Sequence, residues 1–242
     1  MKTYVNRDYE EMSRQAAELI IQSINNKPNS LVCLAAGNTP LGTFAFLVEA
    51  WRRGKVNFDQ CHFISLDEWV GLGSADEGSC RQTLDEHFFK LCGIQEENIH
   101  FFNGKSDDLQ AECSKMDARI QAHAAIDVLL LGVGMNGHLG FNEPNISFDM
   151  YTHVIDLDAI TKQVSAKYFT EQRDVQKGIT LGIKHLMEAE IVIVVADGAK
   201  KADIMRKALS YEITNEIPVT VLQGHPNLHV CLDEAAASFI KA

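Results

Sequence analysis

The sequence predicts an α/β protein: a single three-layer domain with a largely parallel, Rossmann-like sheet and helices on both faces. Apolar runs of strand length alternate with segments of helical periodicity along the whole chain, as in repeated strand–helix–strand units. The chain has 242 residues, enough for one large domain with a sizeable core. No linker rich in proline, glycine or serine interrupts it, so residues 1–242 are expected to form one domain.

Strands are expected where short apolar runs end at turn residues, and helices where apolar residues recur at helical spacing. In the first half this predicts strands at 30–34, 62–66 and 127–132 and helices at 9–24, 40–51, 80–91 and 108–122. In the second half it predicts strands at 153–157, 191–196, 219–222 and 229–232, helices at 159–169, 179–187 and 199–209, and a short closing helix. Ligands bind outside the carboxyl ends of strands in such sheets, so polar residues that follow strands are the site candidates.

The charge and apolar pattern limit the classes of partner. A net charge of −11 argues against nucleic acid or an anionic membrane surface. A small anionic ligand is compatible with it, because a helix N-terminus and a few local cations can hold a phosphate. No apolar run reaches the roughly 18 residues of a membrane span, and residues 1–8 contain no apolar signal core, so a cytoplasmic protein is expected. A homo-oligomer is compatible with the sequence, which does not specify the oligomeric state.

Cysteine and histidine spacing gives no sign of a metal site. The six cysteines form no Cys-x-x-Cys pair and lie mostly in apolar stretches, which favours reduced core residues over disulfides. The nine histidines show no paired metal-binding spacing. No metal is therefore expected.

The glycine-rich loop after the third predicted strand is the most informative segment. Gly132, Gly134 and Gly137 match the spacing G-x-G-x-x-G of dinucleotide-binding loops. That fingerprint needs a helix to open at the last glycine. Gly140 and Pro144 disfavour a helix there, so a dehydrogenase is disfavoured.

The same loop carries an amide, an imidazole and a carboxylate: Asn136, His138 and Glu143. An imidazole needs an orienting partner to fix its tautomer, and Glu143 is close enough in sequence to be that partner. This composition indicates a proton-transfer site; the alternative is a structural or exposed histidine. A hydrolase triad is disfavoured because no serine lies in a G-x-S-x-G motif.

An acidic pair, Asp67 and Glu68, follows the strand at 62–66 directly. A carboxylate held at the tip of a strand is well placed to act as a general base on a carbon-bound proton next to a carbonyl or imine. The alternative is that one of the two caps a turn, and Glu68 suits that role better than Asp67.

The segment Gly37–Thr39 lies between a strand and a helix, with Thr39 as the predicted N-cap and Pro40 as the first helical residue. A helix N-terminus offers unpaired N–H groups to a phosphate, and Lys200 and Lys201 would supply cations at the same edge of the sheet. The alternatives are a well-capped loop without a ligand and, for the lysines, a solvated helix start.

Four segments together carry a resemblance: Ala36–Pro40, Ser65–Leu72, Gly132–Pro144 and Gly178–Ile183. They resemble the phosphate loop, the two hallmark segments and a later segment of the glucosamine-6-phosphate deaminase/isomerase family, and the resemblance covers essentially the whole chain. It implies that an amino-sugar 6-phosphate is converted to a ketose 6-phosphate and ammonia, in amino-sugar catabolism and without a redox cofactor. The partner it implies is a small-molecule sugar phosphate.

The resemblance also implies residue roles. Asp67 would move the C2 proton during enolisation, and His138, supported by Asn136 and Glu143, would open the pyranose ring. The substrate phosphate would be held by Gly37, Asn38, Thr39 and Lys200.

This chain departs from the family pattern at two positions. The best-known members carry aspartate where it has Asn136; an amide supplies no counter-charge to an imidazolium, so more of that role would fall to Glu143. A phosphate-contacting arginine of many members aligns with Lys167, and lysine lacks the bidentate fork of arginine. Trp69 and the run 178–184 look closer to the galactosamine-6-phosphate isomerase branch, which favours a galacto-configured substrate.

Two other functions are weighed against the deaminase. A 6-phosphogluconolactonase shares the fold and a histidine loop, but it would not need the carboxylate of Glu143. A non-catalytic sugar-phosphate sensor of the regulator type would carry a DNA-binding head, whereas this chain enters its first strand and helix at once and is acidic.

Overall fold

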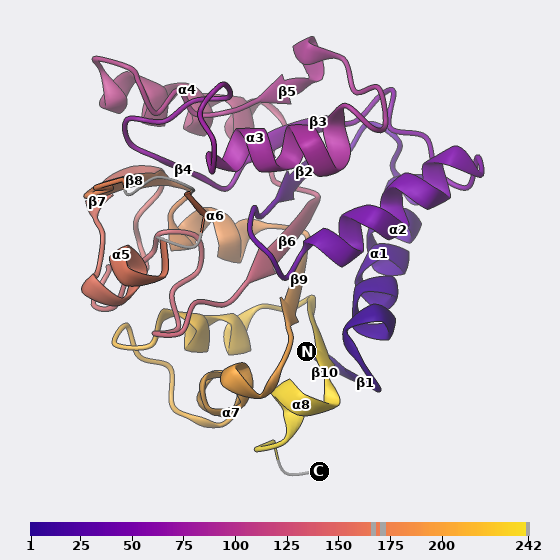
Figure 1. The fold of residues 1–242 in the computed structure, drawn as a ribbon, viewed down its shortest axis with the longest axis vertical. Helices are drawn as coiled ribbons and strands as arrows, with labels where there is room; N and C mark the ends of the chain where they lie inside the picture. The colour runs from indigo at the N-terminus through magenta and orange to yellow at the C-terminus, as the bar shows by residue number, and fades with distance from the viewer. Residues whose placement is uncertain (166–167, 170–172, 241–242) are drawn as a thin grey trace.

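The computed structural model describes residues 1–165, 168–169 and 173–240, and it confirms the predicted fold class. Its main sheet has seven parallel strands, and Figure 1 shows them running through the molecule with helices on either side. In order across the sheet they are β1 (Lys2–Asn6), β10 (Leu228–Asp233), β9 (Ile191–Ala196), β6 (Val128–Gly132), β2 (Leu31–Leu34), β3 (His62–Ser65) and β5 (Ile99–His100).

Alternate residues of the central strands point to opposite faces and build two cores. In β6, Leu129 and Leu131 belong to one core and Val128 and Leu130 to the other. Strands buried on both faces are continuously apolar, which is why the sequence predicts β6 and β9 so directly. The Leu130 face is covered by α1 (Tyr9–Asn26), α2 (Leu41–Arg52), α3 (Cys80–Leu84) and the π-helical turn Asp85–Phe89. The opposite face is covered by α4 (Leu109–Ala122), α6 (Ile183–Glu188), α7 (Ala202–Ser210) and α8 (Glu234–Ala237).

A small antiparallel sheet begins at the carboxyl end of β3, one of the strands of the main sheet. Its order is β4 (Asp67–Trp69), β8 (Lys177–Thr180), β7 (His153–Asp156). Only Leu66 separates β3 from β4, so the chain passes from one sheet to the other where the main sheet ends. A short helix, α5 (Ala159–Ser165), follows β7.

Two of the predicted helices and strands are wrong. The helix predicted at 179–187 is the strand β8 followed by the shorter α6, because residues 177–180 pair with β4 and β7 on both sides. The strand predicted at 219–222 is the 3-10 helix Pro218–Gly224. There Thr220 Oγ1 bonds locally, to the carbonyls of Ile217 and Thr214, and these contacts close a turn in place of a sheet ladder.

Two other expectations concern the cysteines and the membrane. All six cysteines are buried, as predicted for core residues, and their thiols are free. Among the described residues, no helix combines the length and the apolar character that crossing a bilayer requires.

Candidate active site

A cavity of about 680 Å³ opens at the carboxyl ends of four adjacent strands, β9, β6, β2 and β3. The loop after each of these strands contributes to its lining, which is where α/β sheets bind ligands. Of the residues singled out in the sequence, the lining includes Gly37, Asn38, Thr39, Asp67, His138, Lys200 and Lys201. Asn136 and Glu143 are not among the lining residues and contact the His138 segment from behind.

Asp67 is held rigidly at the first position of β4. The residue is 9% exposed, and Ser65 Oγ donates a hydrogen bond of 2.8 Å to its backbone carbonyl. Burial raises the pKa of Asp67 to about 6, while a hydrogen bond from Cys80 and the charge of His138 act to lower it. A carboxyl with this pKa is ionised at neutral pH yet close enough to neutrality to exchange protons, as a general base requires.

Glu68 has a different function from its neighbour. Its Oε1 accepts the backbone N–H groups of Trp69 and Cys80, both at 2.9 Å, and its Oε2 accepts that of Arg81 at 3.0 Å. The fully buried carboxyl therefore ties β4 to the first turn of α3, which confirms the capping role weighed for Glu68. Burial raises the pKa of Glu68 to about 7, against the three N–H bonds.

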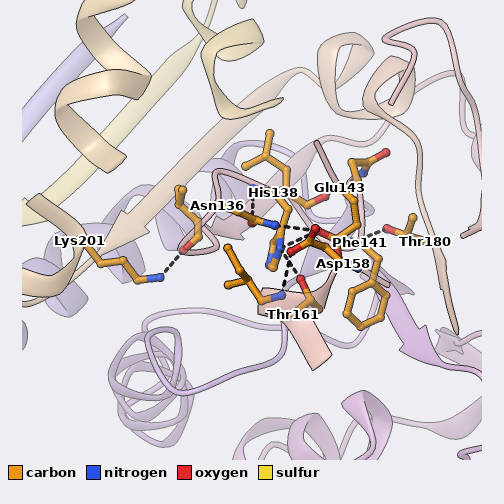
Figure 2. A network of polar contacts seen from close by, with 12 residues as sticks. Asn136, His138, Phe141, Glu143, Asp158, Thr161, Thr180 and Lys201 are labelled. Atoms are coloured by element: carbon orange, nitrogen blue, oxygen red, sulfur yellow. Dashed lines mark hydrogen bonds and ion pairs between the residues drawn. The ribbon is translucent and has the colours of Figure 1, made fainter. Parts of the chain in front are cut away.

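Figure 2 shows the contacts that hold the imidazole of His138. Nδ1 lies 3.1 Å from Thr161 Oγ1 and 3.3 Å from Glu143 Oε2. Since Nδ1 has these two partners, Nε2 is the nitrogen placed to act on a ligand. Residues 133–150 form turns and no helix, in agreement with the prediction from Gly140 and Pro144.

Asn136 and Glu143 form the support behind the imidazole. Asn136 Nδ2 donates to Glu143 Oε2 at 3.0 Å, and Asn136 Oδ1 accepts the backbone N–H of His138 at 3.2 Å. Burial acts to raise the pKa of Glu143, but the hydrogen bond and charge of His138 outweigh it, with Thr161 and Asn136 adding to the net lowering. Glu143 is thus an ionised carboxylate directed at the imidazole.

The loop after β2 is anchored differently from the prediction. Gly37 has a φ of +121°, a conformation that side chains disfavour. Thr39 is not the N-cap of α2: Pro40 occupies that position, and Thr39 Oγ1 instead donates to Asp197 Oδ1 at 2.6 Å. This hydrogen bond connects the loop after β2 to the loop after β9. Its acceptor is a carboxylate, and hydrogen bonds to charged groups are the stronger ones.

The lysines at the same edge differ in their contacts. Lys201 Nζ donates to the carbonyl of Val133 at 2.5 Å, at the start of the histidine loop (Figure 2). Lys200 also lines the cavity. The two lysines follow one another in a 3-10 turn, Ala199–Lys201. The resemblance assigns the phosphate to Lys200, and no local feature of the sequence distinguishes it from Lys201. Lys167, the other lysine predicted to contact the phosphate, lies outside the described residues.

Two further contacts in the site were not predicted. Thr161 of α5 reaches His138, and Cys80 of α3 reaches Asp67, with Sγ 3.3 Å from Oδ1. Both belong to segments remote in sequence from their partners, and no motif marks them.

A parallel sheet whose strand ends bring together a buried carboxylate and a carboxylate-oriented imidazole defines an α/β enzyme site for acid–base chemistry. The chain belongs to the family of glucosamine-6-phosphate isomerases and 6-phosphogluconolactonases, whose model matches residues 7–230.

Known proteins similar to this chain cover nearly its whole length. The glucosamine-6-phosphate deaminase of Thermoanaerobacter pseudethanolicus is 37% identical, over 99% of this chain and 95% of the relative. That of Lachnoclostridium phytofermentans is 40% identical, over 95% and 98%. A solved monomeric glucosamine-6-phosphate deaminase superposes with a TM-score of 0.95 at 34% identity, over 99% of this chain and 100% of that one. The 6-phosphogluconolactonase of Trypanosoma brucei, with a TM-score of 0.76, is 20% identical over 99% and 98%, a likeness of fold alone.

Proposed function

We propose that this protein isomerises and deaminates an amino-sugar 6-phosphate, releasing a ketohexose 6-phosphate and ammonia. The observation that carries the proposal is the placement of Asp67, His138 and the Gly37–Thr39 loop on one cavity. Membership of a family whose relatives are named for this activity supports it.

Ring opening is assigned to His138. Its Nε2 moves a proton from the C1 hydroxyl to the ring oxygen, so that the C1–O bond to the ring breaks and an aldehyde forms. Glu143 and Thr161 hold Nδ1 and fix the imidazole for this transfer. Glu143 also balances the positive charge that the imidazole of His138 acquires when it holds the proton.

The isomerisation is assigned to Asp67. As a base it removes the C2 proton of the open chain while the aldehyde oxygen gains a proton, which gives an enolamine. It then returns a proton to C1 as the amino group loses one, which leaves an imine at C2. Water then adds to this imine, and the C2–N bond breaks to give the ketone and ammonia. The buried carboxyl with a pKa of about 6 suits proton removal next to a carbonyl at neutral pH.

The phosphate is assigned to the Gly37–Thr39 loop with Lys200, and Lys201 lines the same end of the cavity. Gly37 lets the backbone turn close to a ligand, and the start of α2 adds the positive end of a helix. An anion bound there would anchor the sugar in the cavity that Asp67 and His138 also line.

The configuration at C4 is a finer proposal. Trp69 and Gly178, which favour a galacto-configured substrate by resemblance, lie opposite each other in the ladder between β4 and β8. Trp69 also lines the cavity beside Asp67. The relatives reported above are named for glucosamine, and the two epimers are therefore compared directly.

The test is an assay of ammonia and ketose phosphate with galactosamine 6-phosphate, glucosamine 6-phosphate and, separately, 6-phosphogluconolactone. We expect ammonia from at least one amino sugar and no lactone hydrolysis, with a higher kcat/KM for the galacto epimer. Asp67→Asn, purified in the same way, controls for a contaminating deaminase. Lactone hydrolysis without ammonia release would reject the proposal in favour of the lactonase.

A further inference from the structure

The contact between Cys80 and Asp67 has no part in the chemistry above. Cys80 is the first residue of α3 and is 7% exposed. Of the six cysteines, all within the described residues, it is the one that lines the cavity. Its Sγ lies 3.3 Å from Asp67 Oδ1, within the range of a hydrogen bond to sulfur.

The backbone directs this thiol at the carboxylate. Glu68 accepts the N–H groups of Cys80 and Arg81, and Ser79 accepts the N–H of Gln82 as the N-cap. These bonds fix the first turn of α3 against β4, the strand that begins with Asp67. The two acidic neighbours thus act on one helix start, Glu68 on its backbone and Asp67 on its first side chain.

The thiol is a donor in this contact. Burial, followed by the charges of Glu68 and Asp67, raises the pKa of Cys80 well above its usual range. The sulfur therefore keeps its hydrogen, and Asp67 Oδ1 accepts it. The same protonation makes Cys80 a poor nucleophile, so a covalent role does not fit it.

We propose that Cys80 is a positioning residue: its S–H holds Asp67 Oδ1 and leaves Oδ2 as the oxygen that takes the substrate proton. The position of Oδ2 supports this division, since a Cβ built on Gly140, in the His138 loop, would lie 3.3 Å from it. The free oxygen thus faces the loop that carries the imidazole. This inference rests on the proposed function for Asp67.

The test compares Cys80→Ala and Cys80→Ser with the wild type in the pH dependence of kcat/KM. The alanine variant loses a donor to the charged carboxylate, so the acid limb of its profile moves up by roughly half a pH unit. Serine restores a donor, and its acid limb returns to or below that of the wild type. Cys92→Ala, a buried cysteine outside the cavity, controls for packing and leaves the profile in place.

A purely structural role for Cys80 gives a different result. It would lower kcat or stability in both Cys80 variants while the acid limbs overlay that of the wild type, and this outcome would overturn the proposal.

A second measurement does not depend on activity. The infrared S–H band of Cys80, isolated as the difference between wild type and Cys80→Ala, is expected to move to higher frequency in Asp67→Ala, because the acceptor is gone. An unmoved band would also overturn the proposal. If the wild type releases no ammonia while the band moves, the proposed function fails and the contact stands.

Discussion

Trp69 and Gly178 lie directly opposite each other in the antiparallel ladder between β4 and β8, and Phe141 of the histidine loop fills the space over the glycine. A Cβ at residue 178 would lie 2.3 Å from Phe141 Cδ2, and the Phe141 and Trp69 ring centroids are 4.5 Å apart. Trp69 and Phe141 both line the cavity. Because residue 178 has no side chain, Phe141 of the histidine loop can pack against Trp69.

Gly178→Ala tests this relationship. The added methyl group forces the Phe141 ring off Trp69, so we expect a loss of about 2 kcal/mol in the free energy of unfolding and a fall in kcat/KM. Chemical denaturation and steady-state kinetics measure the two effects. Gly224→Ala is the matched control, because the nearest atom to its added Cβ is 3.8 Å away.

The double variant Gly178→Ala/Phe141→Leu makes the test specific. Leucine removes the clashing ring edge, so the double variant should be more stable than the sum of the single losses predicts. Simple additivity would show that residue 178 and Phe141 are not coupled.

The main sheet could be predicted from the sequence because its central strands are apolar on both faces, as in β6 and β9. The edge strands β1 and β5 are short or polar and carry no such signal. The sequence predicts part of β8 as helix. The strand conformation of Gly178–Thr180 is determined by pairing with β4 and β7 on its two sides, and hydrophobic periodicity does not show such pairing.

The candidate site likewise has residues that the sequence predicts and contacts that it does not. Asp67 and His138 follow strands or lie among glycines, so local sequence marks them. The contacts of Thr39 with Asp197, of Thr161 with His138 and of Cys80 with Asp67 join distant segments. Such pairs depend on the closed fold, and one sequence does not contain them.

Asp67→Asn should abolish exchange of the C2 proton with solvent and at the same time stabilise the protein. The folded-state pKa of Asp67 is about 6, above its ordinary 3.8, so stability present below 3.8 is lost as pH rises to about 6. Asparagine avoids this loss, and we expect it to add about 2–3 kcal/mol above that window and little below it. Urea denaturation from acid to alkaline pH measures the difference. Parallel stability curves for the two proteins would contradict the buried-carboxylate explanation, and retained C2 exchange would remove Asp67 from its role.

Asn136→Asp should leave an active enzyme with a narrower pH range. In the wild type the amide donates to Glu143 Oε2 at 3.0 Å; an aspartate there brings two carboxylates together. A shared proton can replace the amide hydrogen, but it is lost as pH rises. The alkaline limb of kcat/KM should therefore move to lower pH, and His138→Asn serves as the inactive reference. An unchanged alkaline limb would show that the side chain at 136 has turned away from Glu143.

Glu68→Gln should destabilise the protein through the start of α3. The carboxylate accepts three backbone N–H groups with two oxygens, whereas an amide offers one oxygen and sets its NH2 group against a donor. We expect a loss of about 2 kcal/mol in the free energy of unfolding, measured by denaturation near pH 5, below the wild-type pKa of about 7, because the buried charge that forms above that pKa costs free energy that glutamine avoids. Glu86→Gln, at an exposed contact with Gln82 in the same helical segment, is the control and should change stability by less than about 0.5 kcal/mol. Equal effects of the two substitutions would mean that Glu68 does not hold the helix to β4.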